Sequence, residues 1–164
     1  MIITSGAGVK TIKLEDSRTI ADALELRFSR GQLSYANGQI EGPTAYGGYA
    51  LPLGAELLLG ATHDRVDMAD PYALRPEDDQ KNLSSAHTFL NKDISLSGKD
   101  GRASLRVTTA NTLPHITKIA PNLWVMTGLG SRGFSFAPLL AEQLMANLTG
   151  APHALTPQVW ERLS

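Results

Sequence analysis

The residues best suited to chemistry form a glycine-rich stretch near the carboxyl end of the chain. Gly128, Gly130 and Gly133 are spaced as G-x-G-x-x-G, between an apolar run at 123–126 and an amphipathic run that begins near Ser135. Glycine lets a backbone turn sharply and approach a ligand closely. A helix that follows such a loop directs its unpaired N–H groups and the positive end of its dipole toward the ligand. The stretch therefore predicts a site for a cofactor with an anionic or electron-rich edge.

The same spacing also fits an ordinary strand–turn–helix corner in which the glycines serve packing. A dinucleotide-binding fold places an acidic residue about 20 residues beyond its glycine loop, and Glu161 lies only loosely at that distance. The loop would therefore be the last glycine loop of a fold and not its first. We expect Ser135 to cap the following helix and Pro138 to lie in its first turn.

Length and composition place the chain among globular proteins. Its 164 residues, 42% hydrophobic and 19% charged, suit one domain or one lobe of a larger protein. The net charge of −1, without a run of Lys or Arg, does not indicate a nucleic-acid surface. The lack of cysteine excludes disulfides and thiolate chemistry. No apolar stretch is long enough to span a bilayer and no signal peptide is evident, so we expect a soluble cytoplasmic protein.

The elements around the glycine loop predict an α+β (mixed α/β) fold. Alternating apolar and polar residues indicate strands, and Pro76 followed by three acidic residues is typical of a helix start. We expect strands at 24–35, 46–52, 56–62 and 102–109, helices at 76–91 and 156–163, a short helix or loop at 19–26, and a loop at 67–75. The strands at 46–52 and 56–62 should form an antiparallel hairpin.

The first residues indicate a chain cut within a fold. A strand-like run at 1–4 leads directly into Ser5, Gly6, Ala7 and Gly8, and a short β-branched strand without a lead-in is usual inside a sheet. The acidic residues at 77–79 are expected to complement the helix dipole, and the four histidines have no ligand spacing. We therefore expect no metal site.

Four stretches, taken in order, resemble the glycine oxidase/D-amino-acid oxidase family of FAD-dependent oxidoreductases. They are 2–8, with a strand and a small-residue turn; 30–34, which reads R-G-Q-L-S; 49–62, similar to the hairpin gY-x-x-P … G-A-T; and 106–114, similar to R-x-x-T-x-D-x-L-P. The loop at 128–133, followed by A-P-L-L-A-E, is very similar to the FAD-dependent half of the bifunctional MnmC-type enzymes, which modify the tRNA wobble uridine. The likeness covers nearly the whole chain but only the C-terminal half of a family member.

The sequence also departs from the family pattern. Asn111 stands where the family usually has Asp, and residues 115–118 replace a P-x-x-G continuation. The N-terminal glycine motif that holds the FAD pyrophosphate and the methyltransferase half of the bifunctional enzymes are absent from the sequence.

The resemblance implies a partial FAD-linked oxidoreductase fold in three parts. Residues 1–22 would form a returning strand of the flavin domain and a connector. Residues 23–108 would form an antiparallel substrate-domain sheet with one helix. Residues 109–164 would form the last strand, glycine loop and helix of the flavin domain.

The resemblance also implies a reaction and its residues. The family removes hydride from the α-carbon of an amine that bears a carboxylate, and water hydrolyses the imine; on tRNA this would remove a carboxymethyl arm from uridine. Arg106 would bind the carboxylate, since a guanidinium holds planar anions bidentately, and Tyr49 would face the substrate. FAD would be the cofactor, although its retention without the N-terminal motif is open. The cofactor-binding residues would be Gly128, Gly130, Ser131, Arg132, Gly133, Phe134, Gly6 and Gly8, with Arg132 and the amides of 131–134 facing the pyrimidine edge of the flavin.

Two alternatives accompany this interpretation. The chain could be a catalytically inactive, truncated lobe that only binds substrate or oligomerises, with a dimer covering its strand edges. It could instead act as a free glycine- or sarcosine-type amine oxidase. The expected partners are a small carboxylate-bearing amine or a modified tRNA, no membrane, and a second copy of the chain or a separately supplied N-terminal half.

Overall fold

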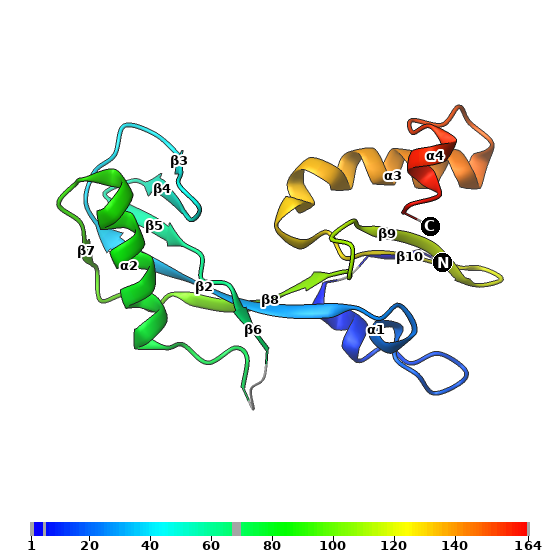
Figure 1. Ribbon diagram of the computed structural model, residues 1–164, viewed down its shortest axis with the longest axis horizontal. Helices are drawn as coiled ribbons and strands as arrows, with labels where there is room; N and C mark the ends of the chain where they lie inside the picture. Colours follow the sequence, from blue (N-terminus) through cyan, green and yellow to red (C-terminus); the bar gives the residue numbers. More distant parts are fainter. Residues whose placement is uncertain (1, 5, 67–69, 164) are drawn as a thin grey trace. The chain divides into compact units, whose positions relative to one another are not determined.

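A computed structural model describes residues 2–4, 6–66 and 70–163 of the chain (Figure 1). Met1 of the expected first strand, Ser5 of the expected turn and residues 67–69 of the expected loop lie outside the described residues. The chain forms two compact units, each with its own hydrophobic core. The terminal unit comprises Met1–Phe28 and Arg106–Ser164, and the central unit comprises Ser29–Leu105.

The terminal unit contains a three-stranded sheet of order β1-β10-β9. Strand β1 (Ile2–Thr4) is parallel to β10 (Leu123–Thr127), and β9 (His115–Ala120) is antiparallel to β10. Strands β1 and β10 were expected from the sequence, but β9 was not. The mixed H-I-T-K-I-A run of β9 has only a weak period of two and follows turn residues. Its pairing with β10 across residues 121–122 stabilises it as a strand.

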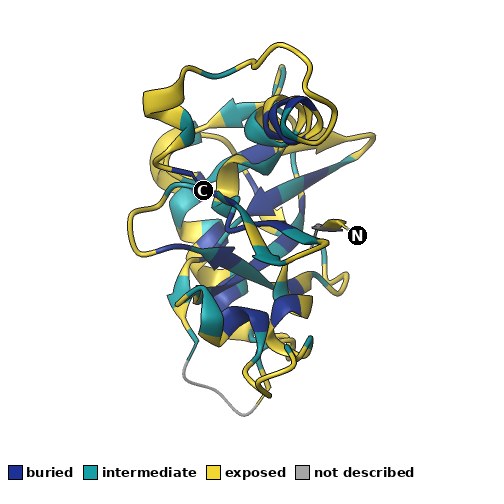
Figure 2. Cartoon of the chain, turned by 90° about the vertical axis from the view of Figure 1, so that its right-hand side faces the viewer, coloured by how far each residue is buried: buried dark blue, intermediate teal, exposed yellow. Residues whose placement is uncertain are grey.

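Helix α3 (Gly133–Thr149) covers one face of this sheet, and Figure 2 shows the buried residues concentrated between the layers. Its inward residues Leu140 and Leu144 pack with Ile116 and Met126 of the sheet. The expectation for the helix start was wrong. Ser135 lies inside the first turn, and Pro138 lies further inside the helix. The cause is the 3-10 helix η2 (Gly130–Arg132), which runs directly into α3 and so removes the need for a separate capping serine.

The other face of the sheet is covered by the short N-terminal elements. These are the 3-10 helix η1 (Ala7–Lys10) and α1 (Ile20–Ala23), whose Val9 and Ile20 pack with Val107 and Val125. Because the sheet is buried on both faces, β10 reads as a nearly continuous apolar run, as is usual for doubly covered strands. Helix α4 (Pro157–Trp160) lies within the expected 156–163 segment.

The central unit is built on the long strand β2 and a hairpin. The sheet has the order β3-β4-β5-β2-β6, and β7 and β8 also pair with β2. Its strands are β2 (Arg27–Asn37), β3 (Thr44–Ala45), β4 (Tyr49–Leu53), β5 (Glu56–Gly60), β6 (Asp64–Arg65), β7 (Ser95–Leu96) and β8 (Arg102–Thr108). The antiparallel pairing of β4 with β5 confirms the expected hairpin.

Helix α2 (Pro76–Leu90) lies beside this sheet in Figure 1 and confirms the helix expected at 76–91. Ala86 of α2 packs with Ala50, Leu57 and Leu59 of the hairpin. Side chains alternate along a strand, so the opposite face carries Tyr49 and its alternate neighbours. One face of the hairpin is therefore core, and the other is not covered by α2.

A buried polar cluster attaches α2 to β2. The Arg30 guanidinium, 0% exposed, forms an ion pair with Asp78, 1% exposed, and donates to the backbone carbonyls of Pro71 and Ala73. Gln32 donates to the carboxylate of Asp79 at 2.9 Å. All three acidic residues lie in the first turn of α2, where they complement the helix dipole as expected, and two of them also bind inward polar groups. No helix among the described residues has the length and apolar character to cross a membrane.

Candidate functional site

Two glycine-containing turns meet at one edge of the terminal sheet. Strands β1 and β10 are parallel, with Thr4 paired to Met126, so both run toward the same edge. Gly6 and Gly8 follow β1, and the loop at 128–133 follows β10. In open α/β sheets, ligands bind outside the carboxyl ends of the strands. The candidate site is therefore this edge, which brings together the two groups of glycines predicted from the sequence.

The glycine loop fits closely against the end of β8. Gly128 and Gly130 have φ of +73° and +58°, which side chains rarely adopt. A Cβ at Gly128 would lie 2.8 Å from the Thr109 methyl carbon, and one at Gly130 would lie 3.2 Å from that of Thr108. Both positions therefore require glycine. Gly133 has an ordinary helical φ of −55° and a nearest neighbour at 3.7 Å, so neither its conformation nor the available space requires glycine.

The start of α3 presents backbone amides at this loop. Its N-cap residue, Arg132, makes no side-chain capping bond, and the first N–H groups of an α-helix have no partner within the helix. Ser131 and Arg132 are exposed, and Phe134 is 104% exposed. An electronegative group placed here would meet both the amides and the positive end of the dipole.

Arg132 is fixed at the loop and is not free in solvent. Its Nη2 donates to the carbonyl of Thr112 at 2.9 Å, and the guanidinium carbon lies 5.2 Å from the centre of the Phe136 ring. Cation–π contact and the hydrogen bond together hold the charge beside the turn at 111–114. The loop therefore carries a positioned positive charge in addition to its amides.

Arg106 belongs to the same unit and approaches the loop through β8. An antiparallel bridge joins Thr108 to Leu129 of the glycine loop. Arg106 is half-buried and precedes Thr108 by two residues, so the two side chains share a strand face at a spacing of about 7 Å along the strand. A carboxylate held by Arg106 would lie near the glycine edge.

Asn111, which departs from the family's Asp, serves as the acceptor of a tight turn. Its Oδ1 accepts from the backbone N–H of Leu113 at 3.0 Å and lies 2.8 Å from the Thr109 hydroxyl oxygen. These bonds require an oxygen acceptor, which Asn and Asp both provide. The substitution therefore preserves the turn that seats Gly128 against Thr109.

Tyr49 lies in the central unit, whereas the other candidates lie in the terminal unit. Its ring fills the space that a Cβ on Gly60 would occupy, at 2.5 Å, and its carbonyl accepts from the Tyr46 hydroxyl at 3.2 Å. The side chain thus takes a defined position on the hairpin face opposite α2.

Three residues that border the loop were not predicted to be site residues. Thr108 and Thr109 form its floor, and the backbone nitrogen of His115 lies 3.7 Å from a Cβ placed on Gly128. The imidazole Nδ1 of His115 is buried and has no hydrogen-bond partner among the described residues. Thr109 is the T of the R-x-x-T-x-D-x-L-P likeness at 106–114, but its contact with the loop could not be predicted, because the close approach of a glycine depends on the tertiary fold.

The edge fits a planar cofactor with a carbonyl-rich or anionic side. Glycines leave room for close approach, amides and a fixed guanidinium supply positive potential, and the turns of two parallel strands form its border. Within the residues that the structure describes, no group of three or more His, Asp or Glu side chains is arranged to hold a metal ion.

Comparison with known proteins identifies the family of the chain. The model of the family described as "FAD dependent oxidoreductase" (DAO) matches residues 1–148. A curated relative from Caulobacter vibrioides, "tRNA 5-methylaminomethyl-2-thiouridine biosynthesis bifunctional protein MnmC", is 43% identical over 137 residues, which cover 82% of this chain and 23% of the relative. The protein of the same name from Caulobacter sp. K31 is 40% identical over 164 residues, covering 94% and 26%. The chain thus spans about a quarter of the length of these relatives.

Solved structures share the fold at low sequence identity. Iminodiacetate oxidase from Chelativorans sp. superimposes with a TM-score of 0.72 at 19% identity, covering 99% of this chain and 45% of that one. Glycine oxidase from Bacillus cereus gives a TM-score of 0.68 at 16% identity, covering 93% and 43%. These likenesses show a partial fold of the glycine oxidase type, as expected from the sequence.

Proposed function

The chain belongs to the family of FAD-dependent oxidoreductases, and we propose that it forms part of an enzyme that oxidises a C–N bond of a carboxymethylamino group carried by a tRNA uridine. The relatives named for tRNA 5-methylaminomethyl-2-thiouridine biosynthesis support the RNA substrate. In this proposal residues 1–22 and 109–164 belong to a flavin domain, and residues 23–108 belong to a substrate domain.

The observation that supports the proposal most strongly is the shared edge of β1 and β10. Both glycine turns follow the carboxyl ends of parallel neighbours, which is where open α/β sheets bind their ligands. Gly6, Gly8 and the glycines of the 128–133 loop would border the FAD. In this proposal the ring of the cofactor, and not its pyrophosphate, lies at this edge.

FAD, when bound, supplies the hydride acceptor of the reaction. The chain's own contribution at the ring would be electrostatic. Amides of Ser131 and Phe134 and the guanidinium of Arg132 would stabilise an electron-rich edge, because oriented donors already in place need no reorganisation. The hydrogen bond from Arg132 to the Thr112 carbonyl would keep that charge in position.

Arg106 would bind the carboxylate of the substrate. A guanidinium stays protonated and binds a carboxylate through two parallel hydrogen bonds, so it can fix both the position and the orientation of the carboxymethyl group. Tyr49, on the hairpin face not covered by α2, would border the remainder of the substrate. Orienting the reacting carbon in this way lowers the entropic part of the barrier.

Flavin uptake is the first test of this proposal. The purified chain should quench the fluorescence of added FAD and acquire flavin absorbance in the visible range. A chain that does neither contradicts a cofactor edge and favours the alternative of a lobe that only binds substrate or oligomerises.

Substrate choice is the second test. Oxidation should be faster with tRNA that carries carboxymethylaminomethyluridine than with free glycine or iminodiacetate. Equal or greater activity on the free amines would favour a simple amine oxidase over the proposed RNA enzyme.

A further inference from the structure

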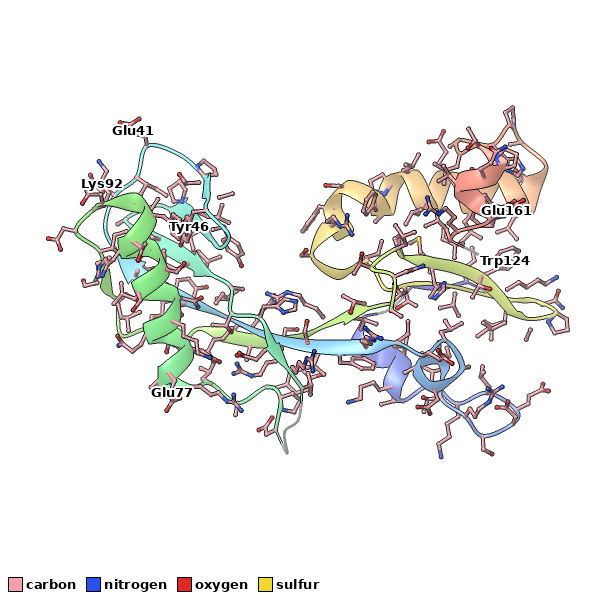
Figure 3. All side chains as sticks on the ribbon, in the orientation of Figure 1. Glu41, Tyr46, Glu77, Lys92, Trp124 and Glu161 are labelled. Carbon is pink, nitrogen blue, oxygen red and sulfur yellow. The ribbon has the colours of Figure 1, made fainter. Side chains whose placement is uncertain are left out.

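A cavity of about 340 Å³ lies in the central unit. Its walls come from the turn between β3 and β4, the segment that follows β5, and α2, and they include Tyr46, Gly48, Ala61, Asp64, Lys81 and Ser85. Figure 3 shows Tyr46 beside α2. Gly60, against which the Tyr49 ring packs, also lines the cavity. Its volume is within the range of small-ligand sites, about 300–1,000 Å³.

The charges around the cavity compensate one another. Lys81 Nζ lies 3.1 Å from Asp78 Oδ1 and 3.5 Å from Asp64 Oδ1, and the hydrogen bond with Asp78 raises the pKa of Lys81, so it stays protonated. Asp78 is also paired with Arg30. A phosphate would meet two carboxylates here, and a cation would meet the lysine. The cavity therefore favours a neutral ligand.

The cavity offers both donors and acceptors to such a ligand. The Ser85 hydroxyl can donate or accept, and the Lys81 ammonium, whose side chain is 56% exposed, can donate. Asp64 Oδ2 is buried and has no hydrogen-bond partner among the described residues. An unpartnered buried carboxylate oxygen is costly, so a ligand N–H that reached it would be favoured. A ligand with N–H and carbonyl groups on one edge would match this set.

Two stacked aromatic rings adjoin the polar wall. The rings of Tyr46 and Phe89 are 5.6 Å apart at an interplanar angle of 19°, and Phe89 is 62% exposed. Burial raises the pKa of Tyr46, so the phenol stays neutral. Proteins recognise bases of single-stranded RNA loops by stacking them on aromatic side chains and hydrogen-bonding their edges. An aromatic stack beside a neutral polar wall provides both.

We propose that this cavity receives a nucleobase from the single-stranded RNA loop that carries the substrate uridine. The inference rests on the proposed function, because it takes an RNA substrate from there. It adds a second recognition site in the central unit, formed by Tyr46, Lys81 and Ser85. An RNA whose loop bases are free would bind, and the same sequence locked in a duplex would not.

Two adjacent serines on α2 allow a matched test. Ser85→Leu fills the cavity, whereas Ser84→Leu adds the same side chain at an exposed position that does not line it. Fluorescence anisotropy with a labelled RNA hairpin should show binding weakened about five-fold or more by Ser85→Leu, since stacking of one base contributes about 1–3 kcal/mol. Ser84→Leu should change binding by less than about two-fold. Equal affinities for the two variants, or no binding of the hairpin by the unaltered chain, would overturn the proposal.

Photochemical crosslinking makes the test independent of variant folding. An RNA hairpin with 4-thiouridine in its loop should crosslink to peptides that contain Tyr46 or residues 60–64 of the unaltered chain. Crosslinks confined to other segments would overturn the assignment. Flavin uptake and oxidation of iminodiacetate should be the same in Ser85→Leu and Ser84→Leu. Absence of flavin uptake by the unaltered chain would reject the proposed function, whereas the RNA binding measured above tests this inference separately.

Discussion

Replacing Gly128 by alanine tests whether the glycine loop needs both its left-handed backbone and its close contact with β8. Gly128 has φ of +73°, and a Cβ there would lie 2.8 Å from the methyl carbon of Thr109. That methyl cannot easily move, because the Thr109 hydroxyl oxygen lies 2.6 Å from the carbonyl oxygen of Leu113 and 2.8 Å from Asn111 Oδ1. The substitution therefore adds a strained backbone and a steric conflict.

The two contributions can be estimated separately. A left-handed conformation costs an L-residue about 1–2 kcal/mol, and forcing an extra carbon into a packed site costs about 1–3 kcal/mol. We expect Gly128→Ala to lower the free energy of unfolding by about 2–5 kcal/mol. Gly150, with φ of +74° and no atom within 4 Å of the position that a Cβ would take, isolates the backbone part. Gly150→Ala should cost only about 1–2 kcal/mol.

The tryptophans provide the assay. Both, Trp124 and Trp160, lie in the terminal unit, so urea unfolding followed by tryptophan fluorescence reports on the unit that contains the loop. Thr109→Ser keeps the hydroxyl and removes the methyl. In combination with Gly128→Ala, Thr109→Ser should recover the stability lost to the steric conflict, and the loss due to the strained backbone should remain.

Equal destabilisation by Gly128→Ala and Gly150→Ala would refute the close fit between the loop and β8. The close fit would also be refuted if Gly128→Ala lowered the free energy of unfolding by the same amount with and without Thr109→Ser. Either result would remove the physical reason for a glycine at the predicted cofactor edge.

Three further predictions concern other parts of the molecule. Asp78→Asn leaves the buried Arg30 guanidinium without its charged partner and should lower the free energy of unfolding by about 3–5 kcal/mol; tyrosine fluorescence measures this change, because the four tyrosines all lie in the central unit. Asp16→Asn is the control, because solvent screens its pair with Arg18, and circular dichroism should show almost unchanged stability. The pKa of the Asp22 carboxyl lies below its usual 3.8, because the hydroxyl of Thr19, the N-cap residue of α1, donates to it. The ionised Asp22 therefore stabilises the fold fully above pH 3.8, and this stabilisation is lost as the pH falls through the lowered pKa. The urea midpoints of the unaltered chain and of Asp22→Asn should therefore converge in acid. Arg106→Ala should lower kcat/KM for carboxylate substrates, by an amount that corresponds to about 2–5 kcal/mol of lost transition-state binding. Steady-state kinetics measure the loss, with Arg102→Ala, an exposed position on the same strand, as the control; unchanged kinetics would remove Arg106 from the site.

The sequence predicted the elements whose signals are local. The helix at 76–91 has proline and acidic residues at its start and apolar residues at helical spacing, and the hairpin consists of two short, mainly apolar runs joined at a glycine turn. The last glycine loop could also be located, because strand, glycines and helix follow one another directly. These features depend on propensity and periodicity, which act over a few residues.

The features that were missed depend on contacts between distant segments. Strand β9 has weak periodicity and is a strand because β10 pairs with it. The inward role of Asp78 depends on Arg30, which is 48 residues away. Ser135 is not a cap because η2 continues into α3. The close fit of Gly128 against Thr109 and of Tyr49 against Gly60 is likewise a tertiary property that a single sequence does not encode in neighbouring residues.

Hydrogen–deuterium exchange with and without FAD tests the central claim most directly. If the edge formed by β1, β10 and α3 contacts the flavin, added FAD should slow amide exchange in residues 6–10 and 128–135 and leave the remainder of the terminal unit unchanged. Exchange that is the same with and without FAD at both turns, or protection confined to other segments, would contradict the account.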